Sequence, residues 1–217
     1  MPPGPPVKYY PVFLNIQAKK AVIIGGGDVA ERKVLALLKA DAVVTVISPE
    51  LTPRLKSLAK DKSIQHISRS YRNNDLKGAF IVVAATDSEV VNRRVSADAC
   101  CLVNVVDVPP LCNFIAPSTI SRGPLTIAIS TSGVSPALAK TIRKELEKQY
   151  GPEMTAYLAF LRKLRQRALS EIPEAAKRGR FLKGLSSEKM LQMLRTKGVG
   201  EVKKAAVAKL DKILNKS

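Results

Sequence analysis

Short apolar runs in the first half of the chain alternate with segments whose apolar residues have helical spacing. The runs lack the polar alternation of a half-exposed strand, so they predict strands buried on both faces. Their ranges are 20–24, 42–47, 64–67, 80–84 and 102–106. The intervening segments at 28–39, 51–60 and 87–99 carry apolar residues every three or four positions. Strands alternating with helices predict an α/β fold, a Rossmann-like doubly wound parallel sheet over roughly residues 10–110.

The pattern changes after Asp107. Two strands are predicted at 114–116 and 125–129, joined by a turn at 121–124, and they form a small α+β region. From Pro136 the spacing is helical almost to the end. Breaks are expected at 151–152, 172–173, Gly179, Gly184 and Gly198. We therefore expect a Rossmann-like domain at 1–113, the small α+β region at 114–150 and a helical domain at 151–217.

Composition supports a globular protein and excludes several classes. The 217 residues are 46% hydrophobic and 25% charged, which is enough to bury a core. The longest apolar stretch, at 80–85, is too short to span a bilayer, and residues 1–6 lack the features of a secretory signal. We therefore expect no membrane association and a cytoplasmic location.

Few side chains are suited to metal binding or nucleophilic catalysis. The three cysteines, Cys100, Cys101 and Cys112, have no Cys-x-x-Cys spacing, which favours reduced, small buried thiols. His66 is the single histidine and is expected to be a packed or surface residue. No metal site is predicted.

The net charge of +18 is unusual for this length. Residues 151–217 hold 16 basic and 6 acidic residues, so positive charge is concentrated in the last third. Such a field attracts nucleic acid, an anionic membrane, or a phosphate or polycarboxylate ligand. The tail has few aromatic residues for base stacking and no recognisable DNA-binding pattern, so no specific nucleic acid is expected.

A glycine turn supplies the first chemical signal. The pattern Gly25-x-Gly27-x-x-Ala30 follows a predicted strand and opens a predicted helix, as in dinucleotide-binding turns. Backbone N–H groups at such a helix start bind phosphates. The second strand ends before Ser48, Pro49 and Glu50, and a carboxylate there favours NAD over NADP. The candidate cofactor-binding residues at these two loops are Gly25, Gly26, Gly27, Asp28, Val29, Ser48, Pro49 and Glu50.

From this turn onwards the sequence resembles one family. The matching segments are Gly25-Gly26-Gly27-Asp28-Val29-Ala30-Glu31-Arg32-Lys33, residues 43–50, 83–87, 104–107, 114–118 and 130–139. In their order and spacing they resemble the precorrin-2 dehydrogenase/sirohydrochlorin ferrochelatase family of sirohaem synthesis. The resemblance covers residues 9 to about 150, and it implies that 114–150 is a dimerisation and substrate region. No methyltransferase domain is expected after residue 217, so a fused trifunctional enzyme is not expected.

The resemblance implies a reaction and partners. Precorrin-2, a tetrapyrrole with eight carboxylates, loses a hydride to NAD and a proton to a base, giving sirohydrochlorin. Some members then insert Fe(II). The resemblance also implies a homodimer.

Further site residues follow from the resemblance. Asp107 matches the catalytic aspartate, the proposed general base, although it could instead be a turn residue before Pro109. Ser130, Thr131, Ser132 and Ser135 would bind substrate carboxylates, and Ser135 is also a helix N-cap candidate. Thr86, Asp87 and Asn104 would contact the cofactor, although Asp87 could cap a helix and Asn104 could hold a turn.

Four functions stay open at this point. The first is a dehydrogenase that also inserts iron, and the second is a dehydrogenase alone. The third is a regulator that senses a dinucleotide without turnover. The fourth is a basic protein that binds nucleic acid.

Overall fold

The computed structural model describes residues 8–215. The chain divides into two compact units, Met1–Ala116 and Pro117–Ser217. The predicted boundaries after residues 113 and 150 stay predictions, and the proline-rich start at 1–6 lies outside the described residues. None of the helices within 8–215 combines the length and the apolar character that a membrane crossing requires.

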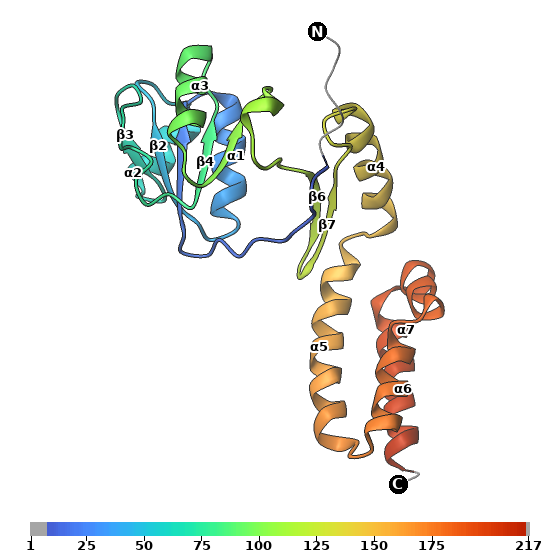
Figure 1. Cartoon of the computed structure of the whole chain (residues 1–217). Coiled ribbons are helices and arrows are strands. Elements are labelled where there is room, and N and C mark those ends of the chain that lie inside the picture. Colours follow the sequence, from blue (N-terminus) through green and yellow to red (C-terminus); the bar gives the residue numbers. More distant parts are fainter. Residues whose placement is uncertain (1–7, 216–217) are drawn as a thin grey trace. The chain divides into compact units, whose positions relative to one another are not determined.

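The first unit is built on a five-stranded sheet in the order β3-β2-β1-β4-β5, with all neighbours parallel (Figure 1). Its elements are β1 Lys20–Ile24, α1 Asp28–Leu38, β2 Val43–Ile47, α2 Pro53–Lys60, β3 Gln65–Ile67, β4 Ile81–Ala84, α3 Glu89–Asp98, β5 Leu102–Val105 and the short 3-10 helix η1 Pro109–Leu111. The chain runs outward from β1 to β3, then crosses back to β4 on the other side of β1. This reversal is the doubly wound arrangement that the apolar runs predicted.

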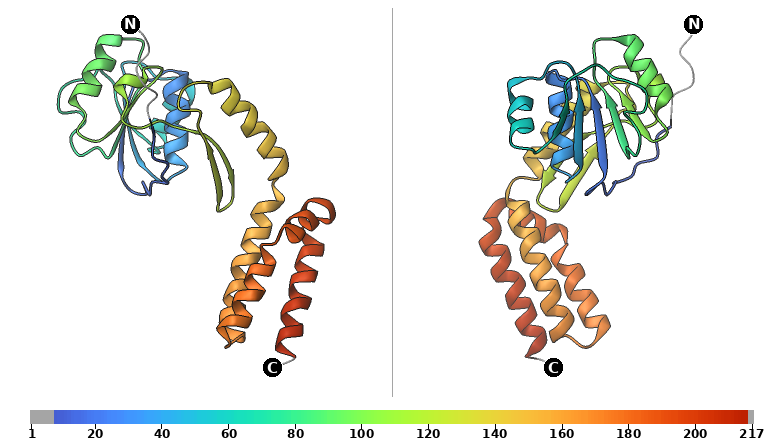
Figure 2. Two further views of the ribbon diagram at one scale, coloured as in Figure 1. Left: turned by 45° about the vertical axis from the view of Figure 1, so that its right-hand side comes forward. Right: turned by 90° about the vertical axis from the view of Figure 1, so that its left-hand side faces the viewer.

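The strands of this sheet are buried on both faces, as predicted. Alternate side chains of β1 enter separate cores: Ala21 and Ile23 pack with residues of α1 and α2, whereas Val22 and Ile24 pack with Val95 of α3. This alternation follows from the two-residue repeat of a strand. The helices therefore cover both faces of the sheet (Figure 2).

One predicted strand of the first unit is wrong. Residues 114–116 form no strand, and the strand that follows is β6 Ser118–Arg122. Phe114 packs against the core beside β1, and its carbonyl oxygen accepts a hydrogen bond from Asn104 Nδ2 at 3.2 Å. Pro117 then lacks the N–H that a strand ladder needs. Phe114 thus extends the first core, and pairing begins after the proline.

The second unit starts with an antiparallel hairpin of β6 and β7 Leu125–Ile129, followed by α4 Pro136–Gln149. The hairpin turns at Gly123, whose φ of +58° suits glycine. Ile120 is buried while Thr119 and Ser121 are exposed, so one face of the hairpin is solvated. The other face packs against α4.

Three further helices, α5 Glu153–Glu171, α6 Ala175–Leu185 and α7 Glu188–Leu214, complete this unit and run side by side (Figures 1 and 2). They share a core that includes Tyr157, Leu164, Leu194 and Leu210. The predicted break at Gly198 is confirmed as a kink inside α7 with a φ of +79°.

The predicted break at Gly179 is wrong, because Gly179 lies within the continuous helix α6. The break predicted at Gly184 agrees with the structure to within one residue, because α6 ends at Leu185. A helix tolerates an interior glycine at a cost of about 1 kcal/mol relative to alanine. Buried Phe181 and Leu185 anchor α6 in the shared core, and this packing outweighs the cost.

Candidate functional site

The glycine turn between β1 and α1 is set by close approach of two neighbouring loops. Gly25 has a φ of +122°, and a Cβ at this position would lie 2.1 Å from the carbonyl oxygen of Ala85. A Cβ on Gly26 would lie 1.9 Å from the carbonyl oxygen of Glu50. Both positions therefore require glycine, because the loops after β4 and β2 close directly over the turn.

Gly27 has a different environment, which suits a ligand. A Cβ there would meet no atom within 4 Å, so the chain leaves open space beside it. Gly27 is also the N-cap of α1 and has no side chain to accept the N–H groups of the first turn. Such N–H groups, together with the positive end of the helix dipole, bind phosphate oxygens. The turn thus fits the pyrophosphate of a dinucleotide.

A cleft of about 690 Å³ opens from this turn at the carboxyl edge of the sheet. Ten of the predicted cofactor-binding residues line it: Gly25, Gly26, Gly27, Asp28, Val29, Ser48, Pro49, Glu50, Thr86 and Asp87. Open α/β sheets bind ligands at this edge, where the strand order reverses between β1 and β4. The structure therefore brings together residues from three separate loops.

The cleft has further lining residues that the sequence reasoning missed, among them Leu51, Thr52, Ser70, Tyr71, Ser88 and Val91. Thr52 was detectable, because Thr-Pro is a typical helix start with threonine as the N-cap. Its Oγ1 accepts the N–H of Leu55 at 3.2 Å, and its own N–H donates to the Gly26 carbonyl oxygen at 3.0 Å. Ser70 and Tyr71 come from the loop after β3, where no motif marked them.

Thr86 and Asp87 follow β4 and form one wall of the cleft. Thr86 Oγ1 donates to Oδ1 of Asn92 on α3 at 2.8 Å, and Asn92 Nδ2 donates back to the Thr86 carbonyl oxygen at 2.8 Å. Ser88, and not Asp87, caps α3, because its Oγ accepts the N–H of Val91 at 3.3 Å. The capping alternative for Asp87 is therefore wrong, and its exposed carboxylate faces the cleft region without that structural role.

Asn104 is not among the residues lining the cleft. It is 8% exposed on β5, and its Nδ2 donates to the carbonyl oxygen of Phe114. The same amide lies 3.6 Å from the sulfur of Cys112. Its predicted contact with the cofactor stays a prediction, whereas the alternative role in holding a local turn has observed partners.

Asp107 lies just beyond β5 at the same edge of the sheet as the cleft. Its φ is +60°, in the left-handed region, within a turn that the Val108 N–H closes onto the Val105 carbonyl oxygen at 3.3 Å. Aspartate tolerates this conformation better than most residues. The Val106 N–H donates to the carbonyl oxygen of Ala84 at 2.9 Å, which ties this turn to the end of β4. Asp107 is exposed, so its carboxylate is accessible from solvent.

Lys33 on α1 provides the positive charge near this turn. Burial lowers the pKa of the Lys33 ammonium, and the adjacent charge of Arg32 lowers it further. The Asp107 carboxylate and the Cys112 thiol oppose both effects. The helix that starts at the glycine turn therefore also places a half-buried amine within electrostatic range of Asp107.

The hydroxyl-rich loop before α4 belongs to the second unit. Ser130 Oγ accepts the N–H of Ser132 at 3.0 Å, Thr131 Oγ1 accepts the N–H of Ser135 at 3.1 Å, and Ser135 Oγ caps α4 by accepting the N–H of Leu138 at 3.2 Å. The capping role of Ser135 is confirmed. Each of these hydroxyls still has its own proton to donate, so carboxylate binding is compatible with the loop structure.

The remaining polar candidates are His66 and the three cysteines. His66 Nε2 lies 2.9 Å from the carbonyl oxygen of Ser48, in keeping with a packed residue. The three cysteines are free thiols, but Cys100 is exposed and Cys101 and Cys112 are only partly buried, so the expectation of buried thiols is wrong. Within residues 8–215 no group of three His, Cys, Asp or Glu side chains is arranged to hold a metal ion.

Comparison with known proteins gives matches over both units. Residues 12–118 match a family described as putative NAD(P)-binding, and residues 122–149 match the central region of sirohaem biosynthesis proteins. The NAD(P)-binding function predicted from the glycine turn is thereby confirmed. A solved structure titled "SirC, precorrin-2 dehydrogenase" aligns with 94% of this chain and 100% of its own, with a TM-score of 0.81 and 25% identity.

Curated relatives are named siroheme synthase. The protein from Thioalkalivibrio sulfidiphilus is 40% identical over 176 residues, which is 80% of this chain and 36% of the relative. The protein from Pseudoalteromonas translucida is 37% identical over 216 residues, which is 96% of this chain and 44% of the relative. The chain thus spans less than half the length of these two relatives. By its two family matches, its fold and these relatives, the chain belongs to the precorrin-2 dehydrogenase/sirohaem synthase family.

Proposed function

We propose that this protein is an NAD-dependent dehydrogenase that converts precorrin-2 to sirohydrochlorin. The observation that carries the proposal is the placement of Asp107 beside the dinucleotide cleft. Asp107 follows β5, and the loop after the adjacent strand β4 forms a wall of the cleft. A cofactor site and an accessible carboxylate therefore occur at one sheet edge, as a hydride transfer coupled to proton loss requires.

Different cofactor-binding residues would hold different parts of the dinucleotide. The N–H groups at the start of α1 would hold the pyrophosphate, with Gly27 leaving room for it. Glu50, at the end of the loop after β2, would accept hydrogen bonds from the adenosine ribose hydroxyls, and its negative charge disfavours a 2′-phosphate. NAD is therefore proposed over NADP. When bound, it supplies the hydride acceptor.

Asp107 would act as the general base. Oxidation of precorrin-2 transfers a hydride to the cofactor and releases a proton from the macrocycle, and the Asp107 carboxylate would accept this proton before passing it to water. Its observed turn holds the carboxylate in an accessible position, and the hydrogen bond from Val106 to Ala84 fixes the turn relative to the cleft wall. General-base catalysis contributes roughly 10²–10⁴-fold to such steps.

The hydroxyl-rich loop would recognise the acidic substrate. Ser130, Thr131 and Ser135 each accept a backbone N–H and retain an O–H that can donate to a carboxylate. Ser132, with a φ of +52°, completes the loop. Substrate binding by these residues is proposed because precorrin-2 carries carboxylates around its rim.

Two finer features rest on the family resemblance: insertion of Fe(II) as a second substrate at the same carboxylate, and assembly as a homodimer. A cytoplasmic location is proposed from the sequence composition. The free thiols of the three cysteines are compatible with a reducing compartment.

The function is tested by mixing the pure protein with precorrin-2 and NAD under anaerobic conditions and following NADH absorbance. We expect NADH and sirohydrochlorin to form in equal amounts. A parallel assay with sirohydrochlorin and Fe(II) tests metal insertion. A protein that binds NAD but forms no NADH from active precorrin-2 would be a dinucleotide sensor, and the proposal would fail.

A further inference from the structure

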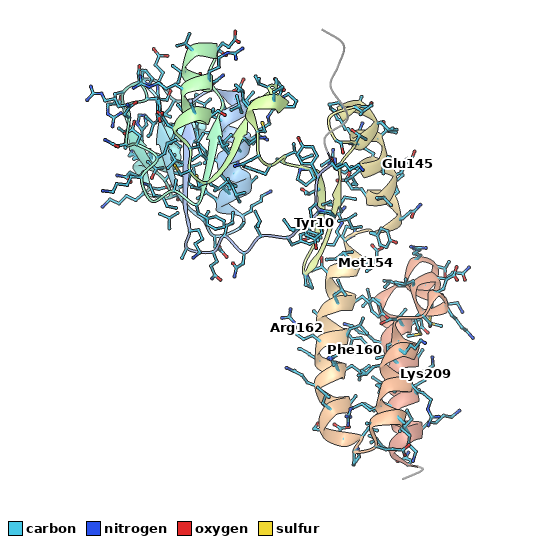
Figure 3. All side chains as sticks on the ribbon, viewed as in Figure 1. Tyr10, Glu145, Met154, Phe160, Arg162 and Lys209 are labelled. Carbon is cyan, nitrogen blue, oxygen red and sulfur yellow. The ribbon has the colours of Figure 1, made fainter. Side chains whose placement is uncertain are left out.

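A second hollow, distant in sequence from the glycine turn, lies between α6 and α7. This groove has a volume of about 470 Å³. Four basic residues line it: Lys177, Arg180, Lys209 and Lys212. Figure 3 labels Lys209 on α7 within this helical region. None of the roles proposed above uses this groove.

The charge around the groove is poorly compensated. Lys177 pairs with Glu174 at 2.9 Å. For Arg180, Lys209 and Lys212, no carboxylate in residues 8–215 lies within ion-pair distance. Like charges gathered at one place destabilise a protein unless an anion offsets them. The groove therefore presents a cluster of cations suited to a ligand with several negative charges.

The floor of the groove is apolar and open. Phe181 and Ile213 contribute apolar surface, and Gly184 lies one helical turn after Arg180 on α6. A Cβ on Gly184 would meet no atom within 4 Å, so neither packing nor backbone conformation requires glycine there. Because Gly184 has no side chain, the floor of the groove stays clear there. Alanine at this position would stabilise the helix by about 1 kcal/mol. A flat apolar body fits such a surface.

We propose that this groove is a second binding site for a tetrapyrrole polycarboxylate, separate from the dehydrogenase cleft. The proposal rests on the proposed function, because precorrin-2 and its product combine an apolar macrocycle with acidic side chains around the rim. The macrocycle would lie on the floor at Phe181 and Gly184, while carboxylates would pair with Arg180, Lys209 and Lys212. The site would keep substrate or product bound to the protein outside the dehydrogenase cleft.

Two other occupants suit the chemistry less well. Nucleic acid would need several aromatic side chains for base stacking, whereas Phe181 alone is aromatic among the described residues that line the groove. An anionic membrane would need a broad apolar surface, whereas the apolar floor here is recessed between cations. Both remain measurable outcomes of the test.

The experiment titrates the full-length protein with uroporphyrin III, a stable octacarboxylate porphyrin, by calorimetry. One variant, R180E/K209E, reverses two groove charges. A second, Gly184→Leu, fills the floor without changing charge. The matched control, K183E/K189E, reverses two exposed lysines on the same helices that do not line the groove. Circular dichroism checks that each variant keeps its helices.

Of the uroporphyrin III that wild type binds, we expect both groove variants to lose one equivalent or to bind that equivalent about tenfold or more weakly. The control variant should keep it. Equal binding in all proteins, or equal weakening in the control, would overturn the proposal. The proposal would also be overturned if the groove variants bound phosphatidylglycerol vesicles or DNA more weakly than wild type but bound uroporphyrin III equally well.

The NADH assay separates this inference from the proposed function. Groove variants should keep the wild-type kcat with saturating precorrin-2, because none of these residues belongs to the dehydrogenase machinery. Failure of NADH formation in wild type would contradict the dehydrogenase. Normal NADH formation together with unaltered uroporphyrin III binding in the groove variants would contradict only the second site.

Discussion

The hydroxyl of Thr52 donates a hydrogen bond of 2.6 Å to Oε2 of Glu31 and thereby joins the first turns of α1 and α2. The same Oγ1 accepts the N–H of Leu55, and the Thr52 N–H donates to the carbonyl oxygen of Gly26. One threonine thus supports both the glycine turn and the helix that follows the Glu50 loop. The shape of the cofactor cleft depends on this residue.

Replacing Thr52 with valine should weaken both stability and cofactor binding. The variant loses the helix cap and leaves Glu31 without its donor, at a cost of about 1–2 kcal/mol in the free energy of unfolding. Thr52→Ser keeps the hydroxyl and serves as the control. Urea unfolding and calorimetric NAD titration measure the two effects. Equal stability of the valine and serine variants would show that these hydrogen bonds contribute nothing.

The two glycines at 26 and 27 should respond differently to alanine. Gly26→Ala places a Cβ against the carbonyl oxygen of Glu50, so the loop after β2 must move and the first unit loses stability. Gly27→Ala places a Cβ in open space at an allowed φ of −83°, so its stability should stay within about 0.5 kcal/mol of wild type.

The affinity for NAD is the second property to measure on the Gly26 and Gly27 variants. Gly27→Ala should bind NAD more weakly although it remains folded, because its methyl group occupies the space that the pyrophosphate would use. Thermal unfolding and NAD titration together separate folding from binding. Unchanged NAD affinity in Gly27→Ala would contradict the assignment of the pyrophosphate to this turn.

Acid should destabilise the first unit partly through Asp75. Its carboxylate accepts two hydrogen bonds from Arg69, at 2.7 and 2.8 Å, and one from the Arg72 N–H at 2.7 Å. The Arg69 hydrogen bonds hold the pKa of the Asp75 carboxyl below its usual range, despite the opposing effect of burial. Because the folded pKa lies below the unfolded value near 3.9, this stabilisation is present above about pH 4 and is lost as pH falls through the folded pKa.

Asp75→Asn isolates that contribution. At pH 7 the variant should lose about 1–3 kcal/mol of unfolding free energy, because two charge-assisted hydrogen bonds are weakened. The difference from wild type should shrink as pH falls from 5 towards 3. Urea unfolding at several pH values measures it. A difference that stayed constant over this range would contradict the role assigned to the ionised carboxylate.

The helical region offers a comparable test at Tyr157. Its hydroxyl is buried and donates a 2.5 Å hydrogen bond to the carbonyl oxygen of Leu185, at the end of α6. Tyr157→Phe leaves that carbonyl unpaired in the core and should cost about 1–3 kcal/mol. Thermal unfolding monitored by circular dichroism provides the readout. An unchanged midpoint would mean that water replaces the hydroxyl.

Most of the first unit follows from local sequence signals. The apolar runs at β1, β2, β4 and β5 are continuous because both faces of a parallel strand are buried. Such continuous runs are visible in the sequence. The strand predicted at 114–116 is wrong because Phe114 packs into a core formed by distant segments, and sequence spacing does not record that contact. Glycine weakens a helix locally, but packing of Phe181 and Leu185 in the shared core keeps α6 continuous through Gly179.

The residues of the candidate site could be predicted where they lie in a recognisable sequence motif. Residues at the glycine turn and at the loops after β2 and β4 come together because parallel strands end at one edge. Tyr71 and Ser70 had no motif, since they reach the cleft through the course of the loop after β3. The predicted cofactor contact of Asn104 stays a prediction, and its side-chain amide donates a hydrogen bond to the Phe114 carbonyl oxygen.

The central claim is that Asp107 accepts the proton released when precorrin-2 is oxidised. Asp107→Asn tests it best, because asparagine also tolerates the left-handed conformation, whereas alanine would add strain of about 1–2 kcal/mol. The decisive measurement is kcat for NADH formation, with unfolding midpoint and NAD affinity measured on the same preparation. We expect a loss of about 10²-fold or more in kcat with both controls unchanged. Turnover within a few-fold of wild type would contradict it.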